Sequence, residues 1–111
     1  MSTRTLKLTL QRDAFEVMVT GEKNEEYRDP STWIRSRLFK NKVERGYDFV
    51  EFTNGYGKHL PRFTAKYRGV EFRTRVYRKY SNGSTVHTTD VYAILLGEIV
   101  SIENYSIPMA L

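Results

Sequence analysis

The chain contains no cysteine, which excludes disulfides and thiolate metal sites. Its two histidines, His59 and His87, are too few for a histidine-rich metal centre, so we expect neither a metal nor a cofactor. No segment has the apolar length of a membrane span, and the first residues carry no apolar run of signal-peptide length. These absences predict a cytoplasmic protein without a membrane partner.

The length of 111 residues fits one domain, residues 1–111, with one modest core. Hydrophobic residues make up 40% of the chain and aromatic residues 14%, which is more than a disordered chain would carry. The composition therefore predicts a folded protein.

Positive charge is concentrated in two segments, while the formal net charge is +5. Residues 58–79 hold eight basic residues against Glu71, and residues 31–45 hold five against Glu44, whereas residues 90–111 contain no lysine or arginine. Such segregation favours a polyanionic partner, and arginine, the commoner cation in the first segment, suits phosphate better than lysine. The alternative is a solvated basic face without a partner. The expected phosphate track consists of Arg62, Lys66, Arg68, Arg73 and Arg75.

Hydrophobic periodicity predicts an α+β fold. Leu6, Leu8 and Leu10 alternate with polar residues over 5–10, which is typical of a half-buried strand, and Phe15 and Met18 have helical spacing within 12–20. Similar patterns predict a helix over 32–40 with Ser31 as its N-cap, and strands over 24–28, 47–53, 62–68, 71–80, 91–96 and 99–102. Turns are expected at 54–57 and, through Asn-Gly, at 81–84. Two early helices and about six strands suggest a small closed or half-closed β-barrel with the helices at its side.

The segment Gly21-Glu22-Lys23-Asn24-Glu25-Glu26-Tyr27-Arg28 carries unusually dense charge at a helix-to-strand joint. If the whole segment is a strand, Lys23, Glu25 and Tyr27 share one face, and Asn24, Glu26 and Arg28 share the other. A charge that is turned inward there is either paired or holds a polar ligand.

In order along the chain, these elements resemble the ASCH domain, a relative of the PUA pseudo-barrel, in its short phage and bacterial form. The most specific matching piece is G-x-K-x-x-E-x-R over 21–28, followed by F-x-N-G-Y over 52–56. The resemblance covers nearly the whole chain. It implies a PUA-like barrel with a cleft beside the first helix, and RNA or nucleotide binding.

One branch of that family hydrolyses an acetylated cytidine nucleoside with a lysine, a threonine and a glutamate. In the resemblance, Lys23 falls on its lysine and Arg28 on its conserved arginine, but Glu26 replaces the threonine, so the hydroxyl is lost. Glu71 and Glu98 are loose candidates for its glutamate. This departure puts the amidohydrolase activity in doubt.

Each candidate residue has a functional and a structural interpretation. Lys23 would act as a base or hydrogen-bond donor, and Glu26 as an acid, a base or an acceptor for an exocyclic amine; alternatively the two form an ordinary salt bridge. Arg28 would clamp a phosphate or form a structural ion pair.

The loop formed by Asn54, Gly55 and Tyr56 would present an amide, backbone N–H groups and an aromatic ring to a base, or serve only as a turn. Trp33 would stack on a base or belong to the core.

Three functions follow from these residues. The first is a nucleic-acid-binding module for RNA, single-stranded nucleic acid or a modified nucleotide. The second is a small metal-independent hydrolase of a modified nucleoside or of RNA, with Lys23 and Glu26 as catalytic residues. The third is an interaction module or inhibitor whose basic face binds an acidic protein.

Overall fold

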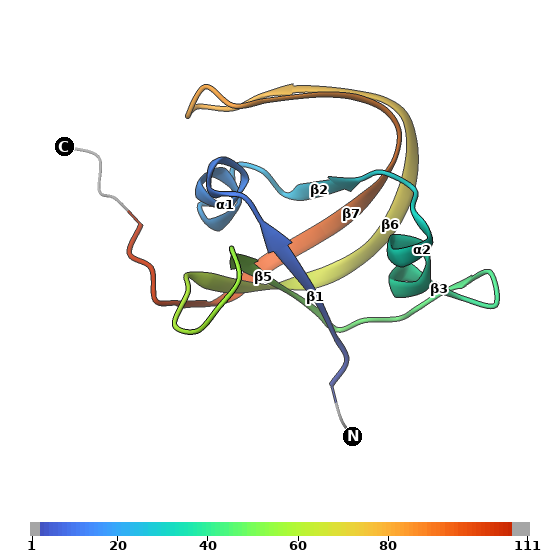
Figure 1. Ribbon diagram of the computed structural model, residues 1–111, viewed down its shortest axis with the longest axis horizontal. Coiled ribbons are helices and arrows are strands. Elements are labelled where there is room, and N and C mark those ends of the chain that lie inside the picture. Colours follow the sequence, from blue (N-terminus) through green and yellow to red (C-terminus); the bar gives the residue numbers. More distant parts are fainter. Residues whose placement is uncertain (1–2, 108–111) are drawn as a thin grey trace.

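The computed structural model describes residues 3–107 and has an α+β fold with two helices and a mixed five-stranded sheet (Figure 1). The sheet order is β1-β5-β6-β7-β2, in which β1 and β5 are parallel and the other neighbours are antiparallel. A separate two-stranded hairpin, β3 with β4, follows the second helix. The elements are β1 (Thr5–Leu10), α1 (Arg12–Val19), β2 (Glu25–Arg28), α2 (Thr32–Leu38), β3 (Phe39–Lys40), β4 (Val43–Glu44), β5 (Phe49–Asn54), β6 (Arg62–Lys79) and β7 (Thr85–Glu103).

Both predicted helices are present, and their ends have local causes. The Ser31 hydroxyl accepts a hydrogen bond from the Ile34 N–H at 3.1 Å, which confirms the predicted N-cap of α2. The prediction that this helix reaches Lys40 was wrong, because Phe39 and Lys40 are extended and pair with β4. Neither helix, nor any other in residues 3–107, is long and apolar enough to span a membrane.

The strands β6 and β7 are longer than the sequence indicated. Each was predicted as two shorter strands, but Arg62–Lys79 and Thr85–Glu103 each form one continuous strand. Register shifts between Thr64 and Val70 interrupt the ladder without ending it, and Gly69 adopts φ +111° there. The two strands bend together through a wide arc and meet at the predicted turn over 81–84 (Figure 1).

The core lies between the concave side of the sheet and the two helices. Phe15 of α1 is fully buried and packs edge-on against Phe63 of β6, with ring centroids 5.4 Å apart. Ile34 and Leu38 of α2 are also buried in this cluster. As predicted, Leu6, Leu8 and Leu10 all face the core.

The sheet is open rather than closed. Its order ends at β1 and β2, and within residues 3–107 these edge strands share no backbone ladder. A side chain joins them instead, because the Arg28 Nη2 of β2 donates to the Thr9 carbonyl of β1 at 2.8 Å. The sequence predicted a closed or a half-closed barrel. The strand order shows that the barrel is not closed.

Candidate functional site

A cleft of about 630 Å³ lies where the edge strands approach each other at the start of α1. The parallel strands β1 and β5 both end here, so the loops that follow them meet at one edge. In open sheets, the space beyond the carboxyl ends of parallel strands is a common place for ligands. The lining residues are Thr9, Leu10, Gln11, Arg12, Ala14, Glu26, Arg28, Asn54, Gly55 and Tyr56.

Five of the residues predicted from the sequence as ligand-binding therefore lie together in this cleft: Glu26, Arg28, Asn54, Gly55 and Tyr56. The loop after β5 is fixed beside β1, because the Gly55 N–H donates to the Leu10 carbonyl at 3.2 Å. Gly55 has φ +89°, a conformation that favours glycine and supports the predicted turn. Tyr56, in the same loop, is 89% exposed.

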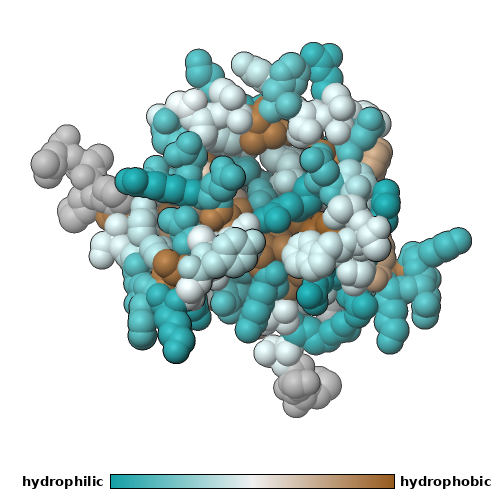
Figure 2. All heavy atoms as spheres, viewed as in Figure 1, coloured by the Kyte–Doolittle hydropathy of each residue, from teal (hydrophilic) through white to brown (hydrophobic). Residues whose placement is uncertain are grey.

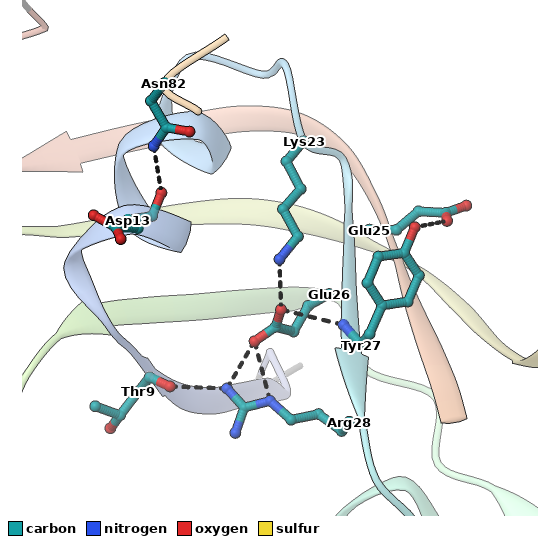
Figure 3. Close-up of polar contacts among 8 residues, drawn as sticks. All are labelled: Thr9, Asp13, Lys23, Glu25, Glu26, Tyr27, Arg28 and Asn82. Atoms are coloured by element: carbon teal, nitrogen blue, oxygen red, sulfur yellow. Dashed lines mark hydrogen bonds and ion pairs between the residues drawn. The ribbon is translucent and has the colours of Figure 1, made fainter. Parts of the chain in front are cut away.

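The Glu26 carboxylate is the centre of a buried charge cluster, which we define as Lys23, Glu26 and Arg28 (Figure 3). Its Oε1 accepts from the Lys23 Nζ and from the Tyr27 N–H, both at 3.1 Å. Its Oε2 accepts from the Arg28 Nε at 3.1 Å and lies 2.9 Å from the Arg28 Nη2. Because a carboxylate has about four lone-pair positions, these four donors fill its capacity.

Alternation would place Lys23 opposite Glu26 only if the whole segment were a strand, and it is not; the alternative interpretation, a salt bridge between Lys23 and Glu26, is present. Lys23 precedes β2, which begins at Glu25, so strand alternation does not apply to it. Its N–H bonds the Val17 carbonyl at 2.9 Å, and its side chain turns inward until it is only 5% exposed. Its ammonium group approaches Glu26 from the side opposite Arg28 (Figure 3), and Lys23 does not line the cleft.

Arg28 is the cation of the charge cluster that lines the cleft, beside the Glu26 carboxylate. Its Nε and Nη2 hold Glu26 and Thr9, whereas its Nη1 has no hydrogen-bond partner among residues 3–107. The side chain is 26% exposed, so the guanidinium is fixed but accessible. Such an orientation suits an anionic group in the cleft.

The start of α1 adds further donors, which the sequence analysis did not identify. Gln11 is the N-cap, and within the described residues its side chain makes no capping hydrogen bond. The first backbone N–H groups of a helix lack internal partners and carry partial positive charge, so they attract anions. The signal was present in the sequence, since a helix was predicted from Arg12 directly after a strand.

The outer face of β2 carries a second set of charges, separate from the cleft. The Arg73 guanidinium bonds both Glu25 oxygens, at 3.2 and 3.0 Å, and Glu71 at 2.8 Å, which raises the pKa of Arg73. Partial burial opposes ionisation of Glu25, but hydrogen bonds from Tyr27 and Arg73 outweigh it and lower the pKa of Glu25. This group is a structural ion-pair network on the sheet surface.

The predicted phosphate track is divided by such pairs. Arg62 lies 3.8 Å from Glu51 and 3.7 Å from Glu103, and the Lys66 Nζ lies 3.4 Å from Glu98. Arg68 and Arg75 are exposed and have no ion pair within residues 3–107. Of the five cations predicted for the track, these two retain the most freedom to contact phosphate.

Trp33 does not belong to the core, and its predicted stacking on a base remains a prediction. It is 50% exposed and so is not a core residue, and it does not line the cleft. The Arg37 guanidinium lies over its ring, 5.2 Å from the centroid, on the outside of α2.

Figure 2 shows hydrophilic side chains over much of the face that contains α1 and β1, with apolar residues reaching the surface between them.

Comparison with known proteins gives no match to a family model, to a curated protein or to a solved structure. A proposed function therefore rests on the geometry of the cleft.

Proposed function

We propose that the protein is a nucleic-acid-binding module that holds one nucleotide of RNA or of another single strand in the cleft between β1, α1 and β2. The observation that carries this proposal is the meeting of Arg28, Asn54 and Tyr56 in one cleft. Their chemistry is complementary to the three parts of a nucleotide: guanidinium for phosphate, amide for a base edge, and aromatic ring for a base face.

The phosphate would lie between the Arg28 Nη1 and the start of α1. The cluster of Lys23, Glu26 and Arg28 has two cations and one carboxylate, so it places a net positive charge behind the cleft. Arg12 lines the same cleft, although its Nε bonds Glu16 at 2.9 Å. Tyr56 would stack on the base from the loop after β5, in which Gly55 and Gly57 both have positive φ.

In this proposal, Glu26 is a positioning residue. Its oxygens are occupied by four donors, so its part is to hold Arg28 in the orientation that faces the cleft. Lys23 forms an ion pair with Glu26 from the side of the carboxylate opposite Arg28. Exposed Arg68 and Arg75 would contribute the salt-dependent attraction to phosphates outside the cleft.

The hydrolase alternative draws less support. Lys23 and Glu26, its two candidate catalytic residues, bond each other at 3.1 Å, and Lys23 lines two other depressions, of about 470 and 380 Å³, rather than this cleft. We also propose that the chain is a cytoplasmic member of the ASCH family with a PUA-like half-barrel. The motif over 21–28 supports the family, and the side-chain bridge between the edge strands supports the half-barrel. The third alternative, an acidic protein partner, has no comparable observation in its favour.

A fluorescence anisotropy titration with labelled single-stranded RNA at increasing salt tests the proposal. The wild-type protein should bind with an affinity that falls linearly in the logarithm of salt concentration. Tyr56→Ala should weaken binding by about fivefold or more, the effect of one lost base stack, without changing stability. Tyr77→Ala is a matched control, because Tyr77 is an exposed tyrosine on the β6–β7 hairpin. Equal affinities for both variants and the wild type would overturn the assignment of the cleft.

A further inference from the structure

A row of three aromatic rings crosses the sheet surface beside α2. The ring centroids of Phe39 and Tyr92 lie 5.5 Å apart, and those of Tyr92 and Phe72 lie 5.9 Å apart. Phe72 is 54% exposed, although it lies in the middle of the long strand β6. A phenylalanine that is about half exposed and packs edge-on against another ring leaves apolar surface available to a partner.

Strand pairing places this row of rings next to Arg28, which lines the cleft. Arg28 of β2 pairs with Tyr92 of β7, and Tyr92 pairs with Phe72 of β6. Directly opposed residues in neighbouring strands point to the same face of a sheet, so Arg28, Tyr92 and Phe72 share one face. Three adjacent strands at roughly 4.8 Å spacing place the first and last of these positions about 10 Å apart.

Basic side chains border the row. A surface depression of about 450 Å³ is lined by Arg35, Ser36, Phe39, Lys42 and Tyr92, so its lining combines two aromatic rings with two cations and contains no acid. Neither Arg35 nor Lys42 forms an ion pair with the residues in 3–107. Aromatic rings alternating with unpaired cations are the chemistry by which proteins hold single strands without strict sequence preference.

We propose that this aromatic row, defined as Phe39, Tyr92 and Phe72, binds the nucleotides next to the one in the cleft, with Arg35 and Lys42 contacting their phosphates. The inference rests on the proposed function and extends it, because it identifies the surface that would bind the nucleotides beside the one in the cleft. The charge of the depression favours a polyanion over an apolar protein segment. The strand would run from the cleft over Arg28 towards α2.

The test compares two ligands, a dinucleotide and a mixed-sequence single strand of about ten nucleotides, on the same protein. Wild-type protein should bind the longer strand more tightly. Phe72→Ala should weaken binding of the longer strand by about tenfold and leave dinucleotide affinity unchanged. Arg35→Ala combined with Lys42→Ala should weaken the longer strand and flatten its salt dependence.

Tyr77→Ala is the matched control, since Tyr77 is 59% exposed on the far hairpin. Phe72 is also exposed, so its loss should leave the fold intact, and circular dichroism checks this. If Phe72→Ala and Tyr77→Ala bind the longer strand equally well while Arg28→Ala loses both ligands, the inference fails and the proposed function stands. If wild-type protein binds neither ligand at low salt, the proposed function fails. Capture of an acidic protein by the aromatic row, with no gain from strand length, would also overturn the inference.

Discussion

The charge cluster of Lys23, Glu26 and Arg28 and the ion pairs of β6 and β7 use the same residue types in opposite ways. In the cluster, the Lys23 and Glu26 side chains are 5% and 8% exposed, and every oxygen of Glu26 is occupied. On the strands, Lys66 and Glu98 are 55% and 73% exposed and lie 3.4 Å apart. Burial and complete hydrogen bonding, rather than charge density in the sequence, therefore distinguish a fixed charge cluster from solvated ion pairs.

The largest expected effect comes from breaking the cluster at its centre. Glu26→Gln removes the negative charge and leaves two cations facing an amide in a buried setting, which should destabilise the protein by about 3 kcal/mol or more. Urea denaturation monitored by circular dichroism measures this loss.

Glu98→Gln is the matched control for that experiment. It removes an exposed ion pair and should change the free energy of unfolding by about 0.5 kcal/mol or less. Similar losses in the two variants would contradict the distinction between the buried cluster and the exposed pairs.

A smaller effect is expected when the cluster loses Lys23 instead. In Lys23→Met, Glu26 keeps the Arg28 guanidinium and the Tyr27 N–H, so the loss should be about 1–2 kcal/mol. RNA affinity should stay within about twofold of wild type, because Lys23 lies outside the cleft. A large loss of RNA affinity in a folded Lys23→Met protein would show that Lys23 contributes to RNA binding.

The exposed cations of β6 should differ among themselves in RNA binding. Arg68→Ala should reduce the slope of log affinity against log salt by about one unit, since Arg68 has no ion pair within the described residues. Arg62→Ala should reduce that slope less, because Glu51 and Glu103 already offset its charge. Salt titrations of both variants measure the slopes. A larger effect for Arg62 would show that Arg62 leaves its ion pairs with Glu51 and Glu103 to contact phosphate when RNA binds.

The smallest effect concerns the tip of the β6–β7 hairpin. Glu22 accepts from the Ser81 hydroxyl at 2.5 Å and from the Ser81 N–H at 2.7 Å, and these bonds lower the pKa of Glu22 from its ordinary value of 4.5. A lowered pKa in the folded state stabilises the protein above pH 4.5, and this contribution is lost as the pH falls through the lowered value.

Acidification should therefore loosen the hairpin tip before it unfolds the sheet. Amide hydrogen exchange at Ser81, corrected for the intrinsic pH dependence, measures the loosening, and Glu22→Gln provides the control without a titrating group. Unchanged protection of Ser81 through the acid range would contradict the contact.

Local patterns in the sequence predicted most elements but not their pairing. The alternating leucines of β1, the Ser31 cap and the Asn-Gly turn depend on neighbouring residues, and each was confirmed. The continuity of β6 through Gly69 depends on its partner β7, so the sequence left residues 69 and 70 unassigned between two predicted strands where the structure has a bulge. The open edge between β1 and β2 is a property of the whole sheet, and the sequence did not decide it.

The candidate site was predictable in part for the same reason. The motif over 21–28 and the loop over 54–57 identified five residues that line the cleft, because charge and glycine patterns are local. The inward turn of Lys23 follows from its backbone bond to Val17, and the pairing of Arg62 and Lys66 follows from strand register. The ion pairs of Arg62 and Lys66 join different strands, so composition alone overstated the free positive charge.

The central claim is that the cleft between β1, α1 and β2 holds a nucleotide. Backbone and arginine side-chain NMR signals, followed while single-stranded RNA is added, test it most directly. We expect the largest shifts at Gln11–Ala14, at the Arg28 Nε and at Asn54–Tyr56. Shifts confined to the outer face of β6, or none at low salt, would contradict it.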